Sequence, residues 1–169
     1  TTGEKLLTIP VIKKSKRDQL ICETELFEPE KSLIQHLNMI KQLYQTAPFY
    51  NEIMESIEVI YQQPHNTLAE LLLSLIKFMT EYLGISTPIV LSSSLNVIGV
   101  KDNKLANICE KLDCHHYISV EGSRNYLEDS DIFKQKNIKV SYHQYEHPVY
   151  SQLYGDFIPF LSTIDLLFN

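Results

Sequence analysis

The sequence predicts an α/β fold in which a mostly parallel sheet is flanked by helices, with an N-terminal hairpin and a three-helix insertion. Three observations predict it: two β-rich segments near the start, three amphipathic segments after them, and an alternation of apolar strands and helices from Pro88 onward. Such alternation is typical of a parallel sheet with crossover helices. At 169 residues, 44% of them hydrophobic, the chain has the size and composition of a single domain spanning residues 1–169.

The hairpin is expected from Leu6–Ile12 (LLTIPVI) and Gln19–Phe27 (QLICETELF), paired as antiparallel strands. In the second segment one face is mainly apolar and the other carries carboxylates, which suits a half-buried edge strand. The loop between them is basic, and we expect its cations to be solvated rather than to bind an anion: Lys13, Lys14, Lys16 and Arg17.

Helical spacing of apolar residues predicts helices over about Glu30–Tyr44 and Asn51–Gln62. A third helix is expected to begin after a capping box formed by Thr67 and Glu70 and to end at Gly84. Three successive helices interrupt a simple strand–helix alternation, so they are interpreted as an insertion over one face of the sheet.

The alternating part is expected to contain strands at Ile89–Ser92, Tyr117–Val120 and Ile138–His143, with helices at Asn103–Leu112, capped by Asp102, and Leu127–Lys136. An aromatic tail, HPVYSQLYGDFIPFLSTIDLLFN, closes the chain with a short helix from about Leu161. This tail is expected to pack across the carboxyl edge of the sheet.

Polar loops follow two of the predicted strands, PIVLSSSL and YISVEGSRNY. Ligands of open α/β sheets bind beyond the carboxyl ends of strands, where helix N-termini present backbone N–H groups. Both loops and the tail are therefore predicted to line one crevice. Its candidate binding residues are Ser92, Ser93, Ser119, Gly122, Ser123, Arg124, Tyr126, Tyr150, Gln152 and His36, and its candidate catalytic residues are His147 and Asp165.

Composition argues against several classes of protein. A net charge of −6 does not supply the basic surface that nucleic acids require, and no apolar stretch is long enough to span a membrane. Three scattered cysteines and the lack of a secretion signal indicate the cytoplasm. No glycine-rich dinucleotide motif is present, and we interpret CEKLDCHH (Cys109–His116) as a packed helix end rather than a zinc site, so no cofactor or metal is predicted.

The motif order resembles the WbqC-like family from about Leu7 to Asn169: the TIPV strand, HLNMIKQLYQTAPFY, VLSSSL, YISVEGSRNYL and, most specifically, the aromatic tail. Members carry a QP-x-Y-x-PW-like segment upstream, which is absent here, so an upstream segment is expected to be missing. The chain also has Ser119-Val120 where the family usually has SG, and Cys114-His115 where it usually has a small residue.

The resemblance implies a role in surface-polysaccharide, lipopolysaccharide and O-antigen biosynthesis, with some members described as candidate glycine transferases. An aminoacyl, glycyl or other acyl group would be moved onto a sugar precursor. From the residues, His147 is the candidate base and Asp165 its orienting carboxylate, while Gly122 N–H and the serine hydroxyls could hold an oxyanion. Arg124 could pair with an anionic group. The expected partner is a small molecule, a sugar nucleotide or an activated amino acid.

Each of these residues also has a structural interpretation. The serines could cap a turn, and Asp165 could cap the last helix. His147 could form a hydrogen bond with the backbone in a turn, and His36 could be a structural histidine whose hydrogen bonds are all made within the fold. The protein as a whole could instead be a non-catalytic module that binds a sugar nucleotide or docks a biosynthetic enzyme. A docking module predicts an exposed aromatic patch at Phe157, Phe160 and Phe168, whereas an enzyme predicts one concave pocket.

Overall fold

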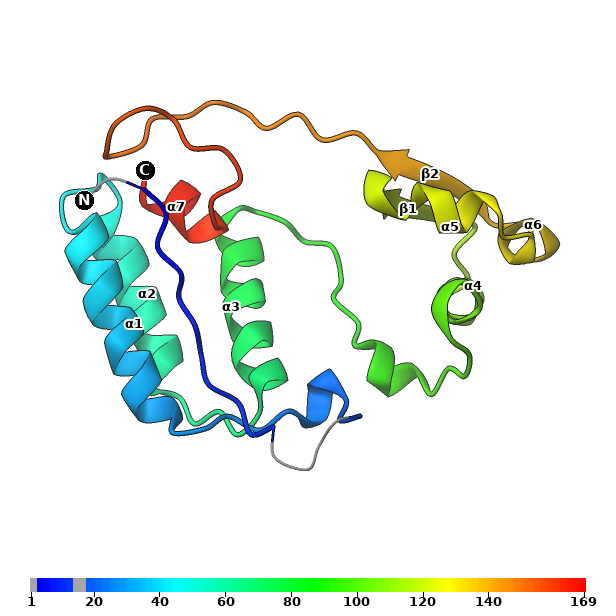
Figure 1. Cartoon of the computed structure of the whole chain (residues 1–169), viewed down its shortest axis with the longest axis horizontal. Coiled ribbons are helices and arrows are strands. Elements are labelled where there is room, and N and C mark those ends of the chain that lie inside the picture. Colours follow the sequence, from blue (N-terminus) through cyan, green and yellow to red (C-terminus); the bar gives the residue numbers. More distant parts are fainter. Residues whose placement is uncertain (1–2, 14–17) are drawn as a thin grey trace. The chain divides into compact units, whose positions relative to one another are not determined.

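A computed structural model describes residues 3–13 and 18–169 of the chain. Its helices are α1 Pro29–Tyr44, α2 Tyr50–Gln62, α3 Leu68–Tyr82, α4 Lys101–Lys111, α5 Arg124–Glu128, α6 Ile132–Gln135 and α7 Thr163–Phe168, and its strands are β1 His116–Val120 and β2 Lys139–His143 (Figure 1). The chain divides into two compact units. We name Thr1–Thr87 with His147–Asn169 the helical unit, and Pro88–Glu146 the sheet unit.

The helical unit is built on the three long helices that periodicity predicts. Helix α1 begins with Pro29 at its first position, where the missing N–H costs nothing. Their apolar faces form one core with the short helix α7, in which Ile53, Ile57 and Phe168 are fully enclosed. The extended first segment runs along α1, where the Thr8 carbonyl lies 3.1 Å from His36 Nε2 (Figure 1).

The capping box of α3 is confirmed. Thr67 Oγ1 accepts a hydrogen bond from the Glu70 N–H at 3.2 Å, and a Glu70 carboxylate oxygen accepts from the Thr67 N–H at 3.1 Å. Backbone bonds from Asn66 and then Thr67 lower the pKa of Glu70 below its ordinary value. Gly84 ends this region with φ of +68°, in the left-handed conformation that glycine adopts at little cost.

Thr67→Ala is expected to lower the free energy of unfolding by about 1 kcal/mol, because it removes the acceptor that satisfies an otherwise unpaired helix N–H. Urea denaturation measures the change, with Thr87→Ala as a control at an exposed position outside the helices. Equal denaturation midpoints for the two variants would show that the cap does not stabilise the protein.

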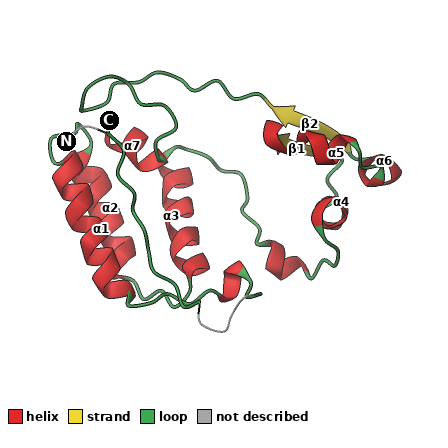
Figure 2. Cartoon of the chain, viewed as in Figure 1, coloured by secondary structure: helices red, strands yellow, loops and turns green. Residues whose placement is uncertain are grey.

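The sheet unit contains a two-stranded parallel sheet, β1 beside β2, in register from His116–Lys139 to Val120–His143 (Figure 2). Its core is small, and the buried apolar side chains that form it are Ala106, Cys109, Leu127, Phe133 and Ile138. Parallel pairing of these two segments agrees with the predicted alternation. The expected mostly parallel sheet is not confirmed, since the described residues form two strands.

Other expected strands also differ in the structure. Ile89–Ser92 is extended up to Leu91 without strand pairing and then enters a 3-10 turn at Ser92–Leu95. In the N-terminal region the hairpin is not confirmed: Val11 and Leu26 form a single antiparallel bridge. A 3-10 turn at Ile21–Glu23 replaces regular strand, and Pro10 has no N–H to donate to a ladder. Of the basic loop, residues 14–17 lie outside the described part.

Two helix predictions in the sheet unit need correction. Asp102 does not cap α4, which starts at Lys101; its carboxylate accepts a 2.6 Å hydrogen bond from Ser130 Oγ instead. The helix expected over Leu127–Lys136 is two short helices, α5 and α6, separated at residues 129–131. The hydrogen bond from Ser130, which is distant in sequence, therefore replaces the capping interaction that was expected of Asp102.

Candidate functional site

The closing tail is anchored by a buried carboxylate on α7. Asp165 is 6% exposed, and its Oδ1 accepts a 2.8 Å hydrogen bond from the Tyr44 hydroxyl at the end of α1. Its Oδ2 accepts from the Tyr150 hydroxyl at 2.8 Å and from Gln152 Nε2 at 3.0 Å. Three donors therefore compensate the cost of burying this acidic side chain. Asp165 joins the tail to α1, beyond the local helix-capping role that the sequence suggested.

The partners of Asp165 are themselves held in place. Burial first, and the bond to Asp165 second, raise the pKa of Tyr44 above its ordinary value, so its hydroxyl remains a donor. Gln152 Oε1 accepts from the Ile158 N–H at 2.8 Å, while its Nε2 donates to the Ile158 carbonyl at 3.0 Å. The Tyr154 hydroxyl donates to the Leu43 carbonyl at 2.8 Å. These bonds fix the tail against the end of α1.

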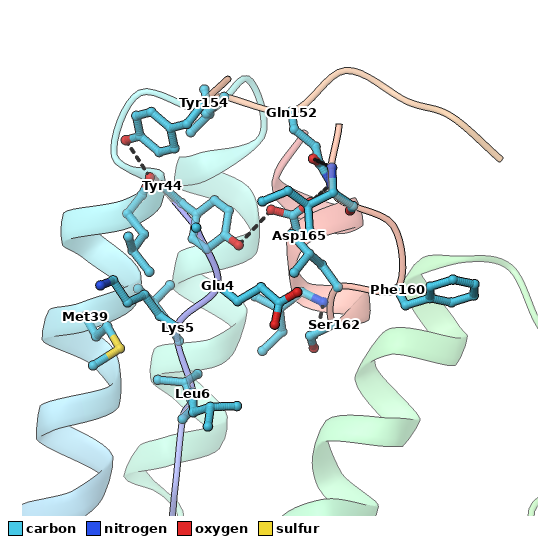
Figure 3. A pocket seen from close by; sticks show the side chains of 18 residues that line it. Glu4, Lys5, Leu6, Met39, Tyr44, Gln152, Tyr154, Phe160, Ser162 and Asp165 are labelled. Atoms are coloured by element: carbon cyan, nitrogen blue, oxygen red, sulfur yellow. Dashed lines mark hydrogen bonds between the residues drawn. The ribbon is translucent and has the colours of Figure 1, made fainter. Parts of the chain in front are cut away.

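A pocket of about 400 Å³ lies within the helical unit, between the first segment, α1, the tail and α7 (Figure 3). Leu6, Met39 and Leu43 are among its apolar lining residues, and the Asp165–Gln152 pair lies at its tail side. Its size lies in the range of small-molecule sites, which combine apolar walls with few polar groups. The pocket is thus a candidate ligand site within one unit.

His147 lies beside this pocket in a cluster of aromatic rings. Its imidazole centroid is 6.2 Å from Tyr150, 5.5 Å from Phe157 and 5.1 Å from Phe160, and Phe160 itself lines the pocket. His147 Nδ1 is 2.8 Å from the Pro148 carbonyl. Because a carbonyl can only accept, Nδ1 carries the proton of the neutral ring, and the basic lone pair is on Nε2. In this tautomer Nε2 is the nitrogen that can act as a general base.

The serine loop after β1 is closed on itself. Ser119 and Ser123 are both buried, their hydroxyl oxygens are 2.6 Å apart, and Ser123 Oγ donates to the Val120 carbonyl at 2.7 Å. The Ser119 hydroxyl must therefore donate to Ser123, so both hydroxyl hydrogens are used within the loop. Gly122 lies in the 3-10 turn Glu121–Ser123, with open space where a Cβ atom would be.

Arg124 is engaged by two carboxylates and one ring. Its Nη2 donates to Glu121 at 2.8 Å, its Nη1 donates to Glu128 at 2.7 Å, and its guanidinium lies 4.0 Å from the centre of the Tyr142 ring. The bond to Glu121, followed by that to Glu128, raises the pKa of Arg124. An anionic ligand would have to compete with these carboxylates. The sequence carried a signal for this pairing, since Glu121 and Glu128 stand three and four residues away from Arg124.

The remaining candidates are surface or structural groups. Ser92 and Ser93 are exposed in their turn, and Tyr126 is exposed on α5. His36 is buried, with its Nε2 at 3.1 Å from the Thr8 carbonyl and its Nδ1 at 3.5 Å from the Tyr61 hydroxyl. That arrangement matches a structural histidine better than a ligand-binding one.

The predicted site residues fall into two groups by unit. His147, Tyr150, Gln152, Asp165 and His36 belong to the helical unit, and the candidates from Ser92 through Tyr126 belong to the sheet unit. A crevice shared by both groups stays a prediction. Around the pocket, sequence reasoning missed Tyr44 and Met39, because their helical spacing indicated packing residues only.

Within residues 3–13 and 18–169, no group of three or more His, Cys, Asp or Glu side chains is placed to hold a metal ion. Within the same residues, every helix is too short or too polar to cross a lipid bilayer.

Comparisons with known proteins cover nearly the whole chain. The profile of the WbqC-like protein family matches residues 1–169. The chain is also similar to "Uncharacterized protein Rv1507c" of Mycobacterium tuberculosis (strain ATCC 25618 / H37Rv), at 32% identity over 169 residues, which cover 99% of this chain and 72% of that protein. No solved structure matches the chain.

Proposed function

The chain belongs to the WbqC-like protein family, and from that premise we propose that it is a cytoplasmic transferase that moves an acyl or aminoacyl group onto a sugar precursor. The precursor is one used in surface-polysaccharide or O-antigen biosynthesis. The observation that carries the proposal is a small-molecule pocket in the helical unit whose lining ring, Phe160, packs against the candidate base His147.

The reaction assigns a clear role to His147. An acceptor hydroxyl or amine attacks the carbonyl carbon of the activated donor while His147 Nε2 takes its proton. The new ester or amide bond forms, the bond to the leaving group breaks, and the proton is returned to that group. The Pro148 carbonyl supports this role by holding the proton on Nδ1.

Asp165 acts through Tyr150. Its carboxylate accepts from the Tyr150 hydroxyl, and the Tyr150 ring packs against the imidazole of His147. We therefore assign it as a positioning residue of the tail, which orients His147 through the Tyr150 ring. An oxyanion-binding role for Gly122 and the serine loop stays a prediction.

The docking alternative has less support. It requires an exposed aromatic patch formed by Phe157, Phe160 and Phe168, yet Phe168 is 0% exposed and packs on the Tyr44 ring at 4.6 Å. Phe160 is 74% exposed, but a single exposed ring is ordinary for a protein surface. The pocket is the stronger basis for a function.

A transfer assay tests the proposal directly. The protein is incubated with acyl-pantetheine thioesters or aminoacyl adenylates together with nucleotide sugars, and products are detected by mass spectrometry. We expect an acylated or aminoacylated sugar that does not form without protein. A protein that binds these compounds but forms no modified sugar in any donor–acceptor combination would contradict transferase activity.

A further inference from the structure

We infer that the pocket of the helical unit binds the hydrocarbon chain of an acyl donor, and that neither a sugar nor a glycyl group is its occupant. The inference rests on the proposed function, because it assigns one of the two substrates of that transfer to this pocket. Three features of the described residues lead to it: the state of the pocket's polar groups, its walls and its size.

The first feature is that the side-chain donors of Tyr44, Tyr154 and Gln152 are already used, which leaves Glu4, Lys5 and Ser162 as the other polar lining residues. The hydroxyl hydrogens of Tyr44 and Tyr154 go to Asp165 and to the Leu43 carbonyl. The amide hydrogens of Gln152 go to the Ile158 carbonyl and to Asp165. A sugar would bring several hydroxyl groups that lose water on entry, and each one left without a partner costs binding free energy. These side chains cannot donate to it without breaking the bonds that hold the tail.

The second feature is the apolar character of the walls. Helix α1 contributes Met39, Ile40 and Leu43, and the tail with α7 contributes Leu153, Leu161 and Ile164. Transfer of a hydrocarbon chain from water to such a surface is favourable, and the chain needs no hydrogen-bond partner there. Met39 is suited to variable chains, because its flexible thioether adapts to the shape of its neighbour.

The third feature is size. A volume of about 400 Å³ is within the range that accommodates an organic ligand of many atoms. A glycyl group has only a few atoms, so it would leave most of this space unfilled and most of the apolar walls without contacts. An extended acyl chain has enough atoms to fill the space and to contact its apolar walls.

Binding of a homologous series tests the inference. The probes are amide analogues of acyl-pantetheine, in which nitrogen replaces the thioester sulfur so that no group is transferred, carrying acetyl, butyryl, hexanoyl or octanoyl chains. Calorimetric titration should give a dissociation constant that falls by about fourfold for each added methylene. Affinity that does not change from acetyl to octanoyl would overturn the inference.

A pair of variants on α1 locates the site. Met39→Trp fills the pocket and is expected to weaken the binding of octanoyl amide by at least about tenfold. Ile34→Trp is the matched control, because Ile34 is 59% exposed and does not line the pocket. Leu161→Trp fills the same pocket from the tail and gives a second test if Met39→Trp unfolds. If a folded pocket variant binds octanoyl amide as tightly as Ile34→Trp, the pocket is not the chain site.

The outcomes also separate this inference from the proposed function. Chain-length-dependent binding that the pocket variants abolish, together with no modified sugar in the transfer assay, would support the pocket assignment and contradict the transferase. Conversely, sugar transfer with UDP-sugar binding blocked by Met39→Trp would support the transferase and overturn the acyl-chain assignment.

Discussion

Replacing Asp165 with alanine is expected to lower the free energy of unfolding by about 3–5 kcal/mol. The substitution leaves the hydroxyls of Tyr44 and Tyr150 and an amide hydrogen of Gln152 without the carboxylate that they now bond. Buried donors without acceptors are costly, and the contact between α1 and the tail is lost with them. Chemical denaturation and the melting temperature measure the effect.

Asp156 provides the matched control for that substitution. It is an exposed aspartate on the same tail, so Asp156→Ala is expected to change stability by less than about 0.5 kcal/mol. Asp165→Asn tests the charge separately, because it keeps the shape but presents an amide group to donors. Similar stabilities for Asp165→Ala and Asp156→Ala would show that the hydrogen bonds around Asp165 do not organise the tail.

Replacing His147 with alanine is expected to lower the rate of transfer by about 100-fold to 10,000-fold, the usual contribution of a general base. Because the ring is half-buried among Tyr150, Phe157 and Phe160, alanine would also loosen the aromatic cluster. His147→Phe separates the two effects, since it retains a ring for packing but has no basic nitrogen. Both variants should lose activity, and the phenylalanine variant should keep the melting temperature of the wild type.

The control for His147 is His115→Ala, because the His115 side chain is 79% exposed in the sheet unit. It should transfer at the wild-type rate. Full turnover by the folded His147→Phe protein would remove His147 from the role of base, while leaving the pocket as a binding site.

The helices were predictable because their signals are local. Apolar spacing over thirteen to sixteen residues defines α1, α2 and α3, and the Thr67–Glu70 box specifies a helix start within four residues. Strands depend on partners elsewhere in the chain. Thus HYISV and KVSYH pair as predicted, whereas LLTIPVI and PIVL have β-rich sequences but do not form regular strands in the described residues.

The sequence indicated which residues of the tail are important better than it indicated what each residue does. The composition of the tail indicated His147, Tyr150, Gln152 and Asp165, and the structure connects all four through hydrogen bonds and ring contacts. The partner that makes Asp165 structural is Tyr44, 121 residues away along the chain, and no local pattern links them. For Arg124, by contrast, a local pattern does indicate the partners, because Glu121 and Glu128 stand three and four residues away in the sequence.

The most direct test of the ligand site is an NMR titration of protein labelled with ¹³C in its methionine methyl groups. The chain has three methionines: Met39 lines the pocket, Met54 is buried in the core of the helical unit and Met79 packs against that core. On addition of octanoyl-pantetheine amide, we predict a large chemical-shift change for the Met39 methyl group and small changes for Met54 and Met79. Binding detected by calorimetry with an unchanged Met39 signal would contradict a ligand site between α1 and the tail.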